Sequence, residues 1–369
     1  MIRLAALQAR GGAYMEQHSN MVFKSIRWQL SLVILVTITL TGCESAGYYA
    51  QAVSGQISVL NAREPISRLL SDPDIPSRLK DRLRLVLELR EFSRDQLHLP
   101  IEDHYLTYAD LKRSYALWNV YAAPEFTLAP KTWCYPIIGC AAYRGYFSKQ
   151  TAVDYADRLK GQGYDVFVGG VAAYSTLGWF DDPVLNTFVY RSRAQLAALI
   201  FHELAHQVLY IPDDTMFNES FATAVEQEGL RRWFSAKNDP SAFDAYKLDH
   251  QRRRQFIQLI VKCRDRLHTL YGKKLPVPEK RSAKEAVFAD LKEDYKILKQ
   301  DWNGHSRYDA WFSNGLNNAK MITVSTYYDL VPAFSALLQS GGNDLESFYR
   351  KCRDLSKKDQ QERRDYLHR

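Results

Sequence analysis

Apolar residues recur at helical spacing over most of the chain, and shorter runs rich in β-branched and aromatic residues occur mainly in its first half. The helical period is strongest over residues 194–209, which hold no Gly or Pro, and Pro212 disfavours helical geometry at the residue before it. The pattern predicts helices at 48–60, 78–97, 151–162, 194–209, 217–234, 242–271, 283–302, 330–338 and 343–355. It predicts strands at 116–122, 126–133, 141–147, 165–169 and 172–177. The fold class is therefore α+β, predominantly helical, with a small β-sheet before the helix of 194–209.

The amino end carries a short apolar run, Leu30 to Leu40, with Lys24 and Arg27 before it. Eleven residues are too few to span a bilayer but suit the apolar region of a signal peptide. The run ends in Leu-Thr-Gly-Cys43, which resembles the bacterial lipobox and implies lipidation and cleavage at Cys43. An ordinary secretory signal or a buried helix is the alternative. Met21 would give a more compact signal and is the expected true start.

Lipidation would anchor the protein to a membrane facing the periplasm, since each buried CH₂ contributes about 0.8 kcal/mol. Glu44, which follows the lipidated position, favours the outer membrane by resemblance to bacterial lipoproteins. Four regions are expected. They are a signal peptide over 1–42, N-terminal helices over 43–100, a catalytic core over 101–235, and a C-terminal helical region over 236–369 that completes the active-site cleft.

Net charge changes little once the signal is removed. The full chain carries +7, and residues 1–42 hold four Lys or Arg and one Glu, which leaves +4. A balance this small, with no basic block or Gly-rich phosphate loop, gives no reason to expect a nucleic-acid partner.

The strongest helix contains the motif H-E-x-x-H, formed by His202, Glu203 and His206. Two histidines at positions i and i+4 share one helix face, so both imidazoles can bind one Zn²⁺, and Glu203 can act as the base that activates water there. A turn then leads into the helix of 217–234, whose Glu219 is placed to return over the first helix as a third ligand. A Glu203 buried on this apolar helix without a metal would be costly, which favours a zinc site over a structural role.

The second helix reads Asn218-Glu219-Ser220-Phe221-Ala222 and resembles the N-E-x-x-A pattern of the gluzincins, which include thermolysin and the membrane alanyl aminopeptidases. The resemblance implies a zincin-like fold, Glu219 as the third ligand, and Glu226 with Asn218 in the layer behind the ligands. The twelve residues between His206 and Glu219 make a shorter gap than in those families. Glu226 therefore stays an alternative ligand.

A longer stretch, 48–348, resembles the bacterial predicted aminopeptidase family of zinc-dependent lipoproteins. The segments that carry this resemblance are Gly-Gly-Val at 169–171, Ala-Tyr-Ser-Thr-Leu-Gly-Trp-Phe-Asp-Asp-Pro at 173–183, Asn-Asn-Ala at 317–319 and Thr-Tyr-Tyr-Asp-Leu-Val-Pro-Ala-Phe at 326–334. The resemblance implies a peptidase with one Zn²⁺ per chain and a peptide substrate.

The strand expected at 172–177 is the candidate edge for pairing with an extended peptide, which makes Tyr174 and Ser175 candidate substrate contacts. Asp181 or Asp182, just after it, is placed to bind the α-amine of a peptide; the alternative is a simple turn before Pro183.

Alanyl aminopeptidases stabilise the oxyanion with a Tyr on a later helix. By this resemblance Tyr327 is the candidate, with Tyr328 behind it; a packing role for either is the alternative.

Four cysteines remain once Cys43 carries lipid. Because the periplasm is oxidising, we expect a disulfide between Cys134 and Cys140; two buried thiols are the alternative. The sequence does not decide whether Cys263 pairs with Cys352.

The sequence therefore predicts a lipid-anchored zinc peptidase of the bacterial envelope, most simply an aminopeptidase. An envelope endopeptidase or chaperone-like protease is one alternative. A non-catalytic zinc-containing scaffold is the other, and the intact Glu203 argues against it because a structural site needs no base.

Overall fold

The structure is a computed structural model that describes residues 46–135, 139–174, 181–313, 315–324 and 330–367. The chain divides into two compact units, residues 1–58 and 59–369. Residues 46–61 are helical, in agreement with the predicted helix at 48–60. No helix within the described ranges combines the length and apolarity that a membrane crossing requires. The expected lipidation site, Cys43, lies outside the described residues.

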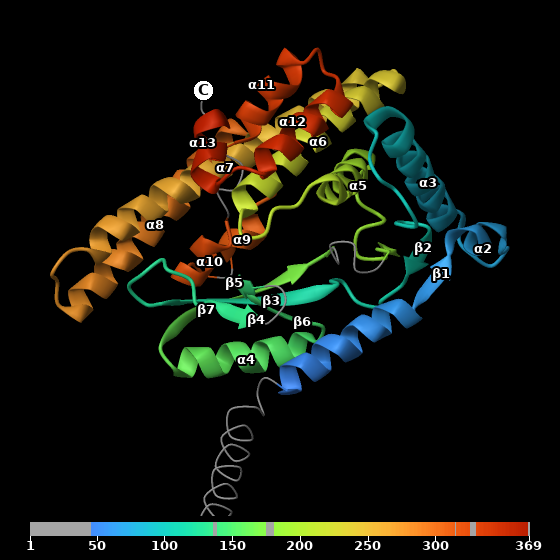
Figure 1. Cartoon of the computed structure of the whole chain (residues 1–369). Coiled ribbons are helices and arrows are strands. Elements are labelled where there is room, and N and C mark those ends of the chain that lie inside the picture. Colours follow the sequence, from blue (N-terminus) through green and yellow to red (C-terminus); the bar gives the residue numbers. More distant parts are fainter. Residues whose placement is uncertain (1–45, 136–138, 175–180, 314, 325–329, 368–369) are drawn as a thin grey trace, which may run out of the picture. The chain divides into compact units, whose positions relative to one another are not determined.

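A three-stranded antiparallel sheet has β3 (Leu117–Pro124) at its centre, between β6 (Arg144–Tyr146) and β7 (Tyr164–Val171). The β3–β7 pairing runs from Leu117 opposite Val171 to Pro124 opposite Tyr164. Helix α4 (Lys149–Gly161) packs on this sheet (Figure 1).

Two smaller sheets complete the strands. In one, β2 (Thr107–Ala109) pairs with β1 (Arg63–Pro65) and with β8 (Val184–Leu185); in the other, β4 (Trp133–Tyr135) pairs with β5 (Gly139–Ala141). Cys134 lies opposite Cys140 in that pair, and the two are joined by a disulfide.

Helices make up most of unit 59–369. Each predicted helix beyond residue 60 has a counterpart within a few residues: α3 (Ser77–Leu97), α4, α5 (Arg193–Val208), α6 (Thr215–Ala236), α7 (Pro240–Tyr271), α8 (Val277–Asp301), α11 (Val331–Ser340) and α12 (Leu345–Ser356). Four short helices were not predicted: α2 (Ile66–Ser71), α9 (Asp309–Ser313), α10 (Asn318–Ile322) and α13 (Gln360–Leu367). The predominantly helical α+β class is confirmed.

The main hydrophobic core surrounds α5 and α6, against which α3, α11 and α12 also pack. The Phe221 and Phe348 rings stack with their centroids 5.7 Å apart, and Phe217 meets Phe334 edge to face at 4.9 Å. A second core joins α7 and α8 around Phe256, which stacks on Tyr308. The main core contains residues from all three regions predicted for the mature chain, 43–100, 101–235 and 236–369. The boundaries between these regions stay a prediction.

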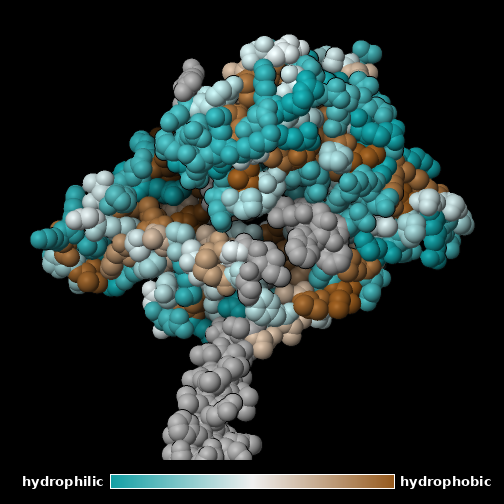
Figure 2. All heavy atoms as spheres, viewed as in Figure 1, coloured by the Kyte–Doolittle hydropathy of each residue, from teal (hydrophilic) through white to brown (hydrophobic). Residues whose placement is uncertain are grey.

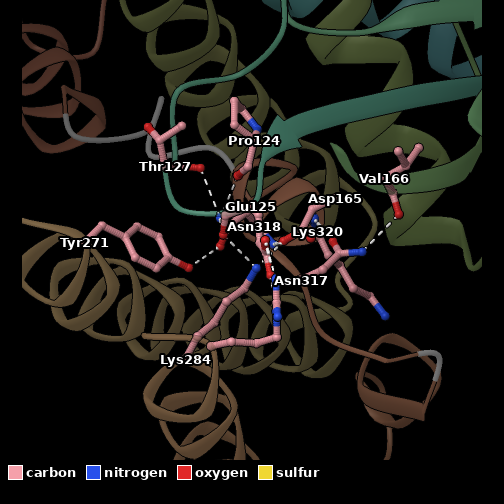
Figure 3. A network of polar contacts seen from close by, with 11 residues as sticks. Pro124, Glu125, Thr127, Asp165, Val166, Tyr271, Lys284, Asn317, Asn318 and Lys320 are labelled. Atoms are coloured by element: carbon pink, nitrogen blue, oxygen red, sulfur yellow. Dashed lines mark hydrogen bonds and ion pairs between the residues drawn. The ribbon is translucent and has the colours of Figure 1, made fainter. Parts of the chain in front are cut away.

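The Asn-Asn-Ala motif at 317–319 fastens α10 to the sheet. The amide nitrogen of buried Asn318 donates to three backbone carbonyls at the end of β3 and just beyond it, those of Pro124, Glu125 and Thr127, at 2.9–3.1 Å (Figure 3). The Lys284 ammonium of α8 joins the same network, donating to Asp165 at 2.6 Å and to the Glu125 carbonyl at 2.8 Å. This motif therefore has a structural role.

Three strand predictions differ from the structure. The strand expected at 141–147 is interrupted at residues 142 and 143, between the end of β5 and the start of β6. Residues 126–132 form no strand, because their backbone turns to meet Asn318 and Ala122; Thr127 accepts from the former, and Lys131 donates to the latter at 2.8 Å. The strand placed at 165–169 continues to Val171, and 172–174 are irregular, while 175–177 lie outside the described residues.

We predict that Gly229→Ala destabilises the fold. A Cβ at this position of α6 would lie 2.7 Å from the Phe201 ring and 2.8 Å from Leu97, both fully buried. Overpacking of this kind costs roughly 1–3 kcal/mol. The control is Gly161→Ala in α4, where a Cβ meets nothing within 4 Å. Denaturant unfolding should show a loss only for Gly229→Ala, and equal stabilities would contradict the proposed close packing.

Candidate active site

Helix α5 presents the two motif histidines on one face. Its start is capped by Ser192, whose hydroxyl accepts from the Gln195 backbone N–H at 3.2 Å, and it ends at Val208, four residues before Pro212. His202 and His206 lie one turn apart, with ring centroids separated by 4.9 Å.

The short connection to α6 is held by side chains at both ends. Buried Asn218 binds Ile211 twice, accepting from its N–H at 2.9 Å and donating to its carbonyl at 2.7 Å. Asp214 caps α6 by accepting from the Phe217 N–H, and its other oxygen pairs with buried Arg363 of α13 at 2.7 and 2.9 Å. These contacts fix the turn between α5 and α6, which lies within the twelve residues that separate His206 from Glu219.

This turn brings Glu219 to both histidines. Its two carboxylate oxygens lie 3.2 Å from the His202 Nε2 and 3.6 Å from the His206 Nε2. One donor atom from each of the three residues falls within 4.8 Å of the others, the one such grouping found within the described ranges. Two imidazole nitrogens and a carboxylate are a donor set that suits Zn²⁺, so the residues fit this metal.

Glu226 lies behind the first histidine. Its carboxylate is 3.1 Å from the His202 Nδ1, on the opposite side of the ring from Glu219. In the neutral ring, a hydrogen bond donated from Nδ1 to Glu226 would leave the Nε2 lone pair free to bind a metal, the arrangement common for histidines that bind one. The structure thus places Glu226 in a supporting position and not among the three converging donors.

The site concentrates charge in a partly enclosed space. Burial opposes a charged His202, but hydrogen bonds to Glu219 and Glu226 outweigh it and raise the pKa of His202 well above its usual value. Burial and the neighbouring His202 lower the pKa of His206 to about 4. Burial, with the charges of Asp182, Glu219 and Glu226, raises the pKa of Glu203 to about 7 despite His202.

Of the two candidate aspartates, the structure places Asp182 and not Asp181 toward the site. Asp182 is buried, and its charge acts on Glu203 and on Tyr174. Asp181 is exposed and contributes its backbone carbonyl to Arg63 at 3.2 Å. The amine-binding role of either aspartate stays a prediction, and Asp182 is the one whose charge acts on Glu203.

Tyr105 was not singled out from the sequence. It is buried, its φ of 61° is strained for a residue with a side chain, and its backbone N–H donates to the Asp182 carbonyl at 2.9 Å. Burial and the charges of Glu203 and Asp182 raise the pKa of its hydroxyl. Strain next to a charged cluster is typical of functional sites, but no local pattern marks this position in the sequence.

Tyr246 of α7 was also missed. Its hydroxyl donates to the second oxygen of Glu226 at 2.8 Å, which completes a chain from Tyr246 through Glu226 to His202. Tyr246 lies twenty residues from Glu226 on another helix, so only the tertiary packing of α6 against α7 reveals the contact.

Three of the predicted site residues stay predictions. Tyr327, Tyr328 and Ser175 are outside the described residues. The predicted disulfide between Cys134 and Cys140 is present. Cys263 and Cys352 are both buried and free, each in a different hydrophobic core, so they do not pair with each other.

Comparison with known proteins gives the class of protein. The family model described as "Putative aminopeptidase" matches residues 47–367, nearly the whole described chain. The chain belongs to this family, which confirms the aminopeptidase resemblance and suggests a hydrolase that acts on peptides. No curated protein and no solved structure matches the chain significantly.

We predict that Tyr246→Phe weakens Zn²⁺ binding about tenfold, because Glu226 would lose the donor that orients it toward His202. The matched control is Tyr271→Phe on the same helix, since that hydroxyl donates to Asn318 at 2.7 Å in the network of Figure 3. Chelator competition should show weaker binding for Tyr246→Phe alone. Equal affinities in the two variants would exclude this role for Tyr246.

Proposed function

We propose that the protein is a zinc-dependent peptidase whose metal is held by His202, His206 and Glu219. The observation that carries the proposal is the convergence of these three donors beside Glu203. Structural zinc sites usually close with four protein ligands, whereas catalytic sites leave one position for water or substrate. Three converging donors, with Glu226 directed to the far side of His202, therefore support a catalytic site.

The chain's own residues supply the proton transfers. Zn²⁺ held by His202, His206 and Glu219 would supply Lewis acidity toward the substrate carbonyl and toward water. Glu203 follows His202 in α5 and lies three residues before His206. Its partly buried carboxylate takes a proton from the attacking water and delivers it to the leaving amine. Glu226, held by Tyr246, keeps the His202 ring in place.

Charge supports an aminopeptidase specificity. Four carboxylates, those of Glu203, Glu219, Glu226 and Asp182, interact across the site. Such an excess of negative charge favours a cationic group on the substrate, and the free α-amine of a peptide is that group. Asp182 is the candidate partner for the amine because its carboxylate is buried and it belongs to neither the ligands nor their support.

The proposed location is the bacterial cell envelope, with the protein tethered by lipid at Cys43 and facing the periplasm. The disulfide between Cys134 and Cys140 supports an oxidising compartment, because such bonds are rare in the cytosol.

We predict that Glu203→Gln retains Zn²⁺ but lowers the rate of peptide hydrolysis at least a hundredfold, since the amide cannot accept the proton. Glu219→Ala should instead lose the metal, because two imidazoles alone bind it weakly. Metal content after dialysis and hydrolysis rates test both. Full activity in Glu203→Gln would refute the mechanism, and a protein that keeps zinc without hydrolysing any peptide would be a scaffold.

We predict that peptides with a free amino end are cleaved and that their N-acetylated forms are not. Asp182→Asn should raise KM for free peptides about tenfold, and the exposed Asp181→Asn serves as its matched control. Comparable cleavage of acetylated peptides by the wild type would identify an endopeptidase instead.

A further inference from the structure

The loop of residues 101–105 holds Asp182 by its backbone. The Asp182 N–H donates to the His104 Nδ1 at 3.1 Å, and the Asp182 carbonyl accepts from the Tyr105 N–H at 2.9 Å. All three residues are buried. Both backbone groups of this aspartate are therefore bound by two consecutive residues of another segment.

These contacts continue the pairing of β2 with β8 beyond the two strands. The strands run parallel to each other; Asp182 lies two residues before β8, and Tyr105 lies two residues before β2. Buried Arg90 of α3 holds the same loop, because its guanidinium donates to the carbonyl of His104 at 3.0 Å and to that of Glu102. The loop that binds Asp182 is thus anchored both to a strand and to a helix of the main core.

The way His104 binds Asp182 does not neutralise the carboxylate. Both ring nitrogens carry protons in a charged histidine, so an accepting Nδ1 means that His104 is neutral, with its proton on Nε2. The Asp182 carboxylate lies 3.9 Å from the same Nδ1, which has no hydrogen to donate to it. His104 therefore fixes the backbone of Asp182 while the negative charge of the side chain is kept.

We propose that His104 is a positioning residue for the amino end of the substrate and acts through Asp182. The inference rests on the proposed aminopeptidase function, in which Asp182 binds the amine, and adds the residue that holds this aspartate in place. A short side chain meets a small cation only if its own backbone is fixed by neighbouring hydrogen bonds. Without an acceptor at position 104, the Asp182 N–H would be buried and unpaired, and the backbone would shift to find another partner.

The first test measures KM and kcat of the zinc-loaded full chain for Leu-Gly amide. His104→Leu should raise KM about tenfold and change kcat by about twofold at most, as expected when binding is lost equally from ground and transition states. His104→Asn should keep KM near the wild-type value, because its amide oxygen can accept from the Asp182 N–H. The matched control is Tyr349→Phe, which removes another buried hydrogen bond, to the Leu97 carbonyl at 2.8 Å, and should lower stability without changing KM.

A double-mutant cycle tests whether His104 acts through Asp182. Once Asp182→Asn has removed the charge that binds the amine, adding His104→Leu should raise KM by about twofold at most, because coupled residues do not contribute additively. Additive increases in KM would show that His104 acts elsewhere and would overturn the inference. An unchanged KM in His104→Leu, with a raised KM in Asp182→Asn, would also overturn it and leave the proposed function standing.

Calorimetric binding to the Glu203→Gln protein provides a second readout that needs no turnover. Leucine amide should bind about tenfold more tightly than N-acetyl-leucine amide, since only its charged amine can pair with Asp182, and His104→Leu in that background should remove most of the difference. An undiminished difference in His104→Leu would overturn the inference. Equal binding of the two amides to the protein with His104 intact would reject the amine-binding role of Asp182 and the inference with it. Absence of hydrolysis by the wild type, with the preference for leucine amide retained, would reject the peptidase function alone.

Discussion

The close packing of α5 on α6 is the constraint on which the site depends. Gly229 lets α6 approach the Phe201 ring, whose next residue in α5 is His202. At the other end of the pair, Asn218 clamps the connection by binding both backbone groups of Ile211. With the distance and the turn both fixed, Glu219 can meet the two histidines after only twelve residues, without a longer loop to bring it there.

Assembling this site has an electrostatic cost. Carboxylates that share a low-dielectric region repel one another, and the raised pKa of Glu203, caused first by burial and then by its acidic neighbours, expresses that repulsion. Within the described residues, histidines and the more distant Arg253 offset part of the charge. A divalent cation and the amine of a peptide would offset more of this negative charge. The proposed metal and the proposed amino end of the substrate would therefore both be attracted by the same excess of carboxylates.

Sequence patterns predicted what is local and missed what depends on tertiary contacts. The helices followed from their period, and the H-E-x-x-H spacing placed His202 and His206 on one face without further information. The choice between Asp181 and Asp182 required knowing which one is buried, and Tyr246 required the packing of α7 on α6. The strand expected at 126–133 failed because its carbonyls and amides are used by Asn318 and Ala122, which no local pattern reveals.

Helix α7 links two of the polar networks among the described residues. Near its start, Tyr246 supports Glu226; at its last residue, Tyr271 donates to Asn318, which is bound to the end of the β3 strand. Both contacts therefore come from one continuous helix of 32 residues. The sheet end is held redundantly, since Lys284 and Asp165 also join α8 to the sheet. At the candidate active site, α7 contributes one hydroxyl, that of Tyr246, which binds Glu226. The orientation of His202 is therefore more sensitive to a single substitution than the attachment of α7 to the sheet.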